Sequence, residues 1–193
     1  MAQLQMETYY YTPEEYLALE DKAEYKSEYI DGQIFAMSGG TLIHNEISFN
    51  VCASLKTALK GKNCKPYIGD VKVLVGNQGA FLYPDVLVVC GKPQFFKNRH
   101  DIVSNPILVV EVLSKSTGNY DRQGKFGLYQ EIESLQDYLL IDQNRLHVQH
   151  YHKLPDGRWV VTIFTHLDSA IQLESLDITL PLSEIYEAID WAE

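Results

Sequence analysis

Apolar residues recur along this chain with two different spacings, one typical of helices and one typical of strands. Between residues 42 and 60 they return at every third or fourth position, which predicts an amphipathic helix with Thr41 as its N-cap. Near the start, Thr12-Pro13-Glu14-Glu15 is a capping box with proline in the first turn. A short helix is therefore expected to run from there to about Asp21.

Strand-like segments fill the middle of the sequence. A hairpin is expected over residues 28–37, because Asp31-Gly32 between apolar flanks is typical of a two-residue turn. Three strands are then predicted, at about residues 66–75, 81–90 and 107–113. The segment 91–105, between the last two, is predicted to be a loop.

The C-terminal part adds one more helix and several strands. In order, the predicted elements are a helix over 119–132, strands over 135–141, 146–151 and 159–165, weak strands near 170–174 and 177–180, and a short helix after Pro181. This order predicts an α/β (α+β) fold with helices flanking a mixed β-sheet, an N-terminal hairpin and a C-terminal antiparallel meander. We expect a single domain over residues 1–193, with residues 1–11 as a flexible tail.

Two of the predicted strands are apolar on both faces, yet each contains a carboxylate. Phe81–Val89 contains Asp85, directly after Pro84, and Ile107–Leu113 contains Glu111. Strands of this kind are typical of a sheet that is covered on both sides, where an isolated charged carboxylate is costly. Because proline cannot donate a hydrogen bond to a neighbouring strand, an irregularity is expected beside Asp85.

The residues alone leave two interpretations of these acids open. Each carboxylate can lie at a strand end, where it is exposed or hydrogen-bonded. Alternatively, the two converge on a divalent cation such as Mg²⁺, which takes one or two carboxylates and completes its shell with water and phosphate oxygens.

Charge is spread unevenly along the chain. The 193 residues carry a net charge of −10, which argues against a protein that coats nucleic acid without specificity. Residues 56–125 nevertheless hold eleven Lys/Arg against five Asp/Glu, a net charge of +6, whereas the rest of the chain carries −16. The imbalance is either chance or the sign of a local cationic surface.

Several classes of protein find no support in the sequence. No apolar run reaches the roughly 20 residues of a membrane helix, and no signal peptide is recognisable. The three cysteines form no CxxC pair, so we expect reduced thiols and a cytoplasmic protein. Gly-x-Ser-x-Gly, Walker and dinucleotide-binding patterns are absent, which leaves serine hydrolases, nucleoside triphosphatases and dinucleotide enzymes unsupported.

A series of motifs places the two acids in a wider pattern. The motifs are, in chain order, Glu28-x-x-Asp31-Gly32, His44 at the start of a helix, Pro84-Asp85-Val, Glu111-Val-Leu-Ser-x-x-Thr117, Asp121-x-x-x-Lys125-x-x-x-Tyr129 and Tyr138-x-x-x-Asp142. Over about residues 12–190 the series resembles the Uma-type restriction endonuclease family of the PD-(D/E)XK nuclease superfamily, formerly a domain of unknown function. The resemblance implies a restriction-endonuclease-like core, a divalent metal ion and DNA as the substrate.

The sequence departs from the superfamily pattern at one position. A lysine is expected two residues after the second acid, but Leu113 stands there. Lys115 keeps the strand parity of Glu111 if the strand continues past Ser114, whereas Lys125 lies on the stripe of the next helix that is predicted to face the sheet. Since migration of this lysine to the neighbouring helix is known in the superfamily, we favour Lys125. The alternative is that its aliphatic stem packs and its ammonium group reaches water.

Two further residues of the pattern are candidates for the site. Glu28 matches the family's hairpin acid, so it is either a metal ligand, a residue that holds a metal-bound water, or a solvent-facing acid. His44 begins a helix, where the dipole favours the neutral ring, and is either catalytic or a packed core histidine.

Three histidines near the C-terminal meander are interpreted differently. His147, His150 and His152 are predicted to belong to an exposed strand, because no cysteine or acid lies at zinc-ligand spacing from them.

Taken together, the sequence predicts a metal-dependent phosphodiesterase, a DNA endonuclease in which Asp85 and Glu111 hold Mg²⁺ or Mn²⁺. Lys125 is expected to position or deprotonate the attacking water and to offset charge in the transition state. Candidate phosphate contacts are Lys56, Lys60, Lys62 and Lys65, or the loop from Lys92 to His100. The rival hypothesis is an inactive nuclease-like fold that binds DNA or another protein. A homodimer through the apolar strands after residue 146 is a further expectation.

Overall fold

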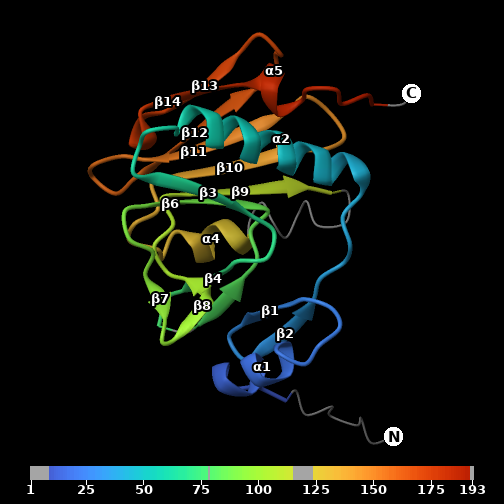
Figure 1. Ribbon diagram of the computed structural model, residues 1–193, viewed down its shortest axis with the longest axis vertical. Coiled ribbons are helices and arrows are strands. Elements are labelled where there is room, and N and C mark those ends of the chain that lie inside the picture. The colour runs from blue at the N-terminus through green and yellow to red at the C-terminus, as the bar shows by residue number, and fades with distance from the viewer. Residues whose placement is uncertain (1–8, 78, 115–123, 192–193) are drawn as a thin grey trace, which may run out of the picture.

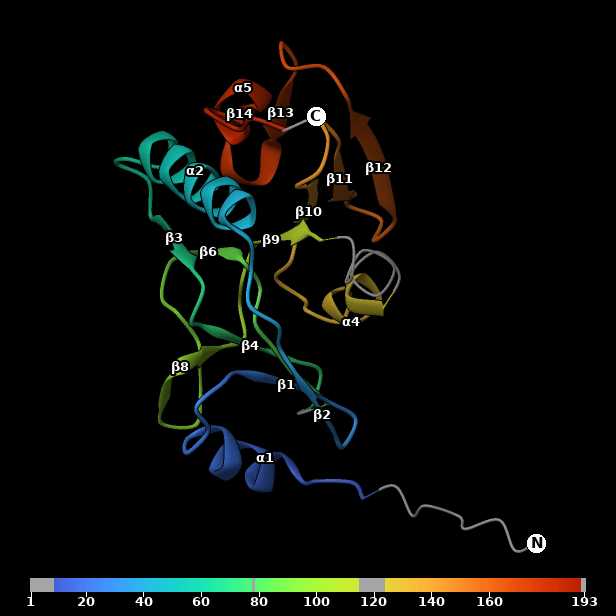
Figure 2. The ribbon, with the colours of Figure 1, turned by 90° about the vertical axis from the view of Figure 1, so that its right-hand side faces the viewer.

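The computed structural model describes residues 9–77, 79–114 and 124–191. In this part of the chain the strands form two six-stranded sheets and one separate hairpin, instead of one larger sheet. The first sheet has the order β2-β1-β5-β4-β8-β7 and the second sheet has the order β12-β11-β10-β9-β6-β3. Figures 1 and 2 show the two sheets one below the other, with the first sheet nearer the N-terminus.

The strands of the first sheet are β1 (Ser27–Ile30), β2 (Gln33–Ala36), β4 (Lys72–Val75), β5 (Ala80–Leu82), β7 (Phe95–Phe96) and β8 (Arg99–Val103). Those of the second sheet are β3 (Cys64–Ile68), β6 (Val86–Cys90), β9 (Leu108–Leu113), β10 (Asp137–Asp142), β11 (Val148–Lys153) and β12 (Trp159–Phe164). The separate hairpin is made of β13 (Ala170–Leu173) and β14 (Ile178–Pro181), joined by the 3₁₀ turn η2 (Glu174–Leu176). The described helices are α1 (Pro13–Glu20), α2 (Leu42–Ala58), α4 (Phe126–Tyr129) and α5 (Leu182–Ile185).

The second sheet is the middle layer of the molecule (Figure 2). Alternate residues of its strands point to opposite faces, so each face has its own apolar core. Val88 and Val110 belong to the face that packs against α2, α5 and the β13–β14 hairpin. Val89 and Val109 belong to the other face, which packs against α4 and the first sheet. On the far side of the first sheet, α1 contributes Tyr16 to a third apolar cluster.

Local signals in the sequence place the helix starts and the first turn. The capping box is confirmed, because Thr12 and Glu15 each accept a hydrogen bond from the other's backbone N–H and α1 begins at Pro13. Thr41 Oγ1 accepts a hydrogen bond from His44 N, which caps α2 as predicted. Asp31 and Gly32 both have positive φ, as a two-residue hairpin turn requires.

Two predicted strands are wrong in the same way. The segment 66–75 breaks at Gly69, whose φ is +81°, so that β3 lies in the second sheet and β4 in the first. The segment 81–90 breaks between Leu82 and Val86, which separates β5 in the first sheet from β6 in the second. The irregularity expected beside Asp85 is therefore the point at which the chain passes from one sheet to the other.

Three further predictions are wrong or concern residues outside the described part of the chain. The segment 91–105 is not a loop, because β7 and β8 lie within it. The helix predicted over 119–132 is observed from Phe126 to Tyr129, and residues 119–123, like residues 1–8 of the predicted tail, are outside the described part. The thiols of Cys64 and Cys90 are not reduced, since these residues lie opposite one another on β3 and β6 and form a disulfide.

Helix length bears on the expectation about membranes. Within residues 9–77, 79–114 and 124–191, no helix is both long enough and apolar enough to span a membrane.

At one edge of the second sheet, β12 exposes Val160, Val161 and Ile163, which belong to the surface that the sequence predicts for a dimer contact.

Candidate active site

An ammonium group joins two carboxylates in the space between the two sheets. Lys125 immediately precedes α4, and its Nζ lies 2.9 Å from Glu28 Oε1 on β1 and 3.4 Å from Glu111 Oε1 on β9. All three side chains are buried, with 6–8% of each exposed. A buried ion pair of this kind is maintained only where further hydrogen bonds satisfy the charged groups.

Two such hydrogen bonds are present at the carboxylates. Tyr83 N donates to Glu28 Oε1 at 3.0 Å. Tyr129, one helical turn after Lys125, donates its hydroxyl to Glu111 Oε1 at 2.9 Å. Burial, together with the negative charges of Glu111 and Glu28, raises the pKa of Tyr129 well above its ordinary value, so its hydroxyl remains a donor.

The carboxylate of Asp85 is held by a histidine of α2 and by the backbone of β9. Asp85 Oδ1 lies 2.8 Å from His44 Nε2, and its Oδ2 accepts a hydrogen bond of 2.7 Å from Val112 N. His44 is fixed in the first turn of α2 by Thr41, whose hydroxyl also donates to Gln143 Oε1 at 2.7 Å. About one fifth of each of the Asp85 and His44 side chains is exposed, so this end of the site reaches the surface.

The pairing of β6 with β9 brings the two acids of the sequence motif together. These strands are antiparallel, with Val86 opposite Val110, so one further step of the same register puts Asp85 opposite Glu111. Glu111 occupies the face of β9 that includes Val109 and Leu113, and that face packs against α4. It therefore points into a core, as its position in the sequence predicts.

Charge and donor type make this group compatible with a hard divalent cation. Glu28 and Glu111 contact one ammonium group, Asp85 stands opposite Glu111 in the strand register, and carboxylate oxygens are ligands that Mg²⁺ and Mn²⁺ prefer. Among the described residues these acids do not bring three ligand atoms within 4.8 Å of one another. They still fit a cation that takes one or two carboxylates and completes its shell with water and phosphate oxygens.

The five candidates named from the sequence thus form two contacting groups, Glu28–Lys125–Glu111 and His44–Asp85. Lys115, the other candidate for the displaced lysine, and Asp121 lie outside the described residues. Tyr129 was recognised only as part of the motif series. Its spacing of four residues from Lys125 is the signal that both side chains reach one carboxylate.

The exposed-strand interpretation of the C-terminal histidines is wrong for His150. This side chain is buried, and its Nε2 lies 2.7 Å from Oδ1 of Asp137. The acid was missed because it stands on β10, and only the pairing of β10 with β11 brings it beside the histidines.

The candidate phosphate contacts fall on two surfaces. Lys56, Lys62 and Lys65 line a pocket of about 630 Å³ beside β3, and Lys62 in addition pairs with Asp177. In the segment from Lys92 to His100, Lys97 pairs with Glu14 and Arg99 pairs with Asp21 and Asp101. The pocket beside β3 is therefore the surface with more available cations.

A family model matches most of the chain. It spans residues 13–183 and describes the family, Uma2, as "Putative restriction endonuclease". Two curated proteins of Synechocystis sp. are similar over nearly their full length. "Uncharacterized protein sll1609" is 35% identical over 86% of this chain and 94% of its own. "Uncharacterized protein slr1290" is 38% identical over 92% of each chain.

One solved structure has a similar fold. It is described as a "putative nuclease belonging to DUF820" from Anabaena variabilis. The two structures superpose with a TM-score of 0.74, covering 91% of this chain and 97% of the other, at 18% sequence identity. The restriction-endonuclease-like fold expected from the sequence is confirmed.

Proposed function

Because the chain belongs to the Uma2 family, we propose that it is a metal-dependent endonuclease that hydrolyses phosphodiester bonds in DNA. The observation that carries this proposal is the Lys125 ammonium group, which lies between Glu28 and Glu111 inside the core. The superfamily pattern has a lysine two residues after the second acid, where this chain has Leu113. Lys125, at the start of the next helix, would provide the missing ammonium group.

Asp85 and Glu111 would hold Mg²⁺ or Mn²⁺, with Glu28 as an additional acid beside Lys125. The chemistry that such an ion would supply when bound is polarisation of the scissile phosphate and a lower pKa of the attacking water. Asp85 is held in place by His44 and by Val112 N, and Glu111 by Tyr129, so the two carboxylates are oriented before substrate binds. Such orientation reduces the reorganisation needed during reaction.

Lys125 would act on the phosphate and on the attacking water. Its ammonium group donates hydrogen bonds, which orient a water molecule and stabilise the negative charge that develops on the phosphate oxygens. Glu28 fixes the ammonium group from the side of the first sheet, at 2.9 Å. Glu28 is accordingly a positioning residue for Lys125 in this proposal.

A lysine-lined surface near Asp85 supports DNA as the substrate. The pocket that contains Lys56 and Lys65 follows β3, and Gly69, just after this strand, donates its N–H to the carbonyl oxygen of Asp85 at 3.1 Å. A strand of DNA whose phosphates contact these lysines would continue toward the acids. If so, Lys65→Gln should reduce the slope of log affinity against log salt by about 1, because one phosphate contact is lost.

The decisive experiment is cleavage of plasmid and linear DNA with Mg²⁺ or Mn²⁺ by the full chain and its variants. Asp85→Asn and Glu111→Gln should each lower the cleavage rate by at least about 100-fold. Asp156→Asn is the matched control, since this acid lies on an exposed turn and pairs only locally with Arg158. Circular dichroism and thermal unfolding would establish that each variant is folded.

Titration calorimetry with Mn²⁺ separates catalysis from an inactive scaffold. The unmodified chain should bind Mn²⁺, and both Asp85→Asn and Glu111→Gln should weaken that binding. Cleavage that survives in folded Glu111→Gln would contradict the proposed site. Absence of both cleavage and Mn²⁺ binding in the unmodified chain would favour a non-catalytic module that binds DNA or protein.

A further inference from the structure

Three side chains meet on the face of the second sheet that is turned away from α4. Asp137 Oδ1 lies 2.7 Å from His150 Nε2 and 2.8 Å from His152 Nδ1. In the described part of the chain, this is the group of three His, Cys, Asp or Glu side chains whose ligand atoms all lie within 4.8 Å of one another.

Strand pairing fixes these positions. β10 and β11 are antiparallel with Asp137 opposite His152, and His150 is two residues away on the same face of β11. This is the face of Leu139 and Val148, which α2, α5 and the β13–β14 hairpin cover. Glu111 is opposite Leu140 on the other face of the sheet, so the cluster is separate from the candidate active site.

The cluster is buried on one side and open on the other. The side chain of Asp137 is fully buried and 8% of the His150 side chain is exposed, whereas 25% of the His152 side chain is exposed. Ser175, on η2, donates its hydroxyl to Asp137 Oδ2 and fixes the plane of the carboxylate. Burial alone would raise the pKa of Asp137, but the bonds from His150, Ser175 and His152 outweigh it and hold the pKa below its ordinary value.

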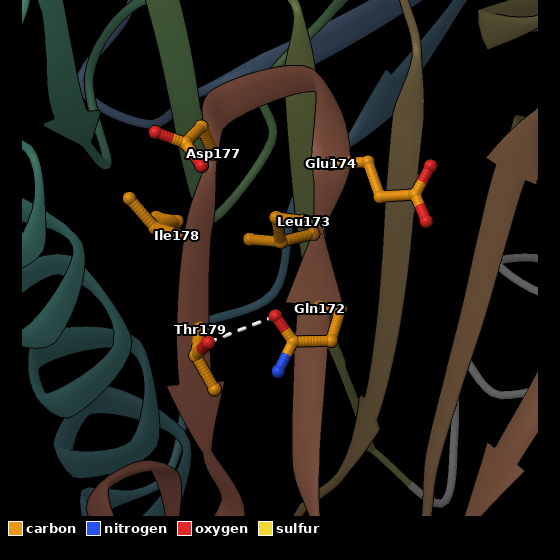
Figure 3. Close-up of a pocket in the computed structure, with 6 residues that line it drawn as sticks. All are labelled: Gln172, Leu173, Glu174, Asp177, Ile178 and Thr179. Carbon is orange, nitrogen blue, oxygen red and sulfur yellow. Dashed lines mark hydrogen bonds between the residues drawn. The ribbon is translucent and has the colours of Figure 1, made fainter.

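Other acids of the β13–β14 hairpin do not join this group. Glu174 and Asp177 point to opposite sides of the hairpin, beside a shallow pocket of about 250 Å³ (Figure 3). Asp177 pairs with Lys62 instead. From the hairpin and its turn, Ser175 is the residue that contacts Asp137.

We propose that Asp137 Oδ1, His150 Nε2 and His152 Nδ1 form a second metal site, which binds a divalent transition ion of the zinc class. Two imidazole nitrogens and one carboxylate oxygen are a zinc donor set, whereas Mg²⁺ prefers oxygen ligands alone. Ligands 2.0–2.1 Å from a tetrahedral ion lie roughly 3.3 Å apart. The two N···O distances, 2.7 and 2.8 Å, would therefore open by about 0.5–0.6 Å.

His152 is the most exposed of the three side chains, so water could reach a bound ion from this side and complete its shell. Ser175 then serves as an outer-shell partner, because its hydrogen bond orients the carboxylate that binds the ion. The site would connect β10 and β11 to the turn of the neighbouring hairpin. The site does not depend on the proposed nuclease activity.

The test uses the full chain with ZnCl₂ and CoCl₂ as probes, in the presence of excess Mg²⁺ to occupy the sites made of carboxylates. Calorimetry should detect one Zn²⁺ per chain. His152→Gln should weaken Zn²⁺ binding by more than about 100-fold, and Ser175→Ala by about 10-fold to 100-fold. His166→Gln, an exposed histidine outside the cluster, and Asp85→Asn should bind Zn²⁺ as tightly as the unmodified chain.

A spectrum of the unmodified chain keeps the test independent of how the variants fold. Co²⁺ should give the intense visible absorption of a four-coordinate ion with nitrogen and oxygen ligands, and Zn²⁺ should abolish that absorption. Failure of the unmodified chain to bind Zn²⁺, or equal binding by His152→Gln, would overturn the proposal. Asp137, His150 and His152 would then be only a hydrogen-bonded cluster that links the sheet to the hairpin through Ser175.

Discussion

Two buried polar clusters lie on opposite faces of the second sheet and are assembled in opposite ways. The candidate active site draws on segments that are far apart in sequence, from Glu28 on β1 to Tyr129 on α4. The cluster on the other face takes its two histidines and its acid from one hairpin, β10–β11, and adds only Ser175 from elsewhere. The first depends on the complete tertiary structure, and the second mainly on one pair of strands.

The clusters also differ in their balance of charge. In the candidate active site one ammonium group lies between two carboxylates, with a third carboxylate, Asp85, just before the adjoining strand β6. Around Asp137 a single carboxylate oxygen faces two ring nitrogens, and Ser175 occupies the other oxygen. A surplus of carboxylates suits a hard cation, whereas a surplus of imidazoles suits a zinc-class ion. The two faces of one sheet thereby offer different chemistry.

The strongest way to test this contrast is to remove the ammonium group. Lys125→Met leaves Glu28 and Glu111 buried without their shared partner, so the free energy of unfolding should fall by about 3–5 kcal/mol. Lys60→Met, at an exposed position, is the matched control and should change stability little. Urea unfolding measures both, and equal stability of the two variants would mean that the pair contributes nothing in the core.

A second substitution sharpens the same experiment. Glu28→Gln removes one of the two carboxylates, so the double variant with Lys125→Met should be more stable than the sum of the single effects predicts. We expect a coupling energy of about 1–3 kcal/mol, as is usual for residues in direct contact. Strict additivity would indicate that the 2.9 Å contact carries no interaction energy.

On the opposite face, Asp137→Ala should have a somewhat smaller effect. It leaves His150 and His152 without their common acceptor and opens a small cavity, which should lower the free energy of unfolding by about 2–3 kcal/mol. Asp156→Ala, on the exposed turn, is the control. If Asp137→Ala proved as destabilising as Lys125→Met, the contrast between a local and a long-range cluster would fail.

Tyr129→Phe tests a single hydrogen bond of the candidate active site. The change removes the hydroxyl group that reaches Glu111 Oε1 and leaves the ring in place, so a loss of about 1–2 kcal/mol is expected. Tyr25→Phe, at an exposed ring, provides the comparison. Thermal unfolding of the two proteins would show the difference, and identical midpoints would exclude a stabilising role for this bond.

The smallest effect is expected at Asp142, at the end of β10 far from Asp137. Burial would raise the pKa of Asp142, but hydrogen bonds from Asn144 and Arg145 outweigh it and lower the pKa. A lowered pKa in the folded state contributes stability above the unfolded value of about 3.9, which is lost as the pH falls through the folded value. Asp142→Asn should therefore cost less than about 1 kcal/mol at pH 7.

The same variant gives a pH test. The difference in stability between the unmodified chain and Asp142→Asn should shrink as the pH is lowered from 6 to 3. Acid titration followed by circular dichroism would measure it. A difference that grows on acidification would contradict a lowered pKa for Asp142.

The parts of the fold that the sequence predicted are those coded within a few residues. The Thr12–Glu15 capping box, the Asp31-Gly32 turn and the Thr41 cap each depend on a local hydrogen bond or a local φ value. Passage between sheets is not coded in this way. Gly69-Asp70 lies between the two apolar segments, but a single such break does not indicate that β3 and β4 belong to different sheets.

The residues of the polar clusters also divide into those that the sequence identifies and those that only the tertiary structure brings together. Asp85 and Glu111 were recognisable because a charge within an apolar strand is conspicuous, and Lys125 because it lies on a core-facing stripe. The association of Asp137 with His150 was not recognisable, since it depends on the register of β10 against β11. Register is set by the packing of whole strands, which a single residue pattern does not reveal.

The bridge from Glu28 through Lys125 to Glu111 has a consequence for the order in which the chain matures. Glu28 belongs to the first sheet and Glu111 to the second, so neither sheet alone contains a complete acid–lysine arrangement. A polypeptide whose two sheets have not docked would therefore lack the Glu28 contact that positions Lys125 in the proposed function. Full competence for the proposed hydrolysis would then arise only when both halves have docked.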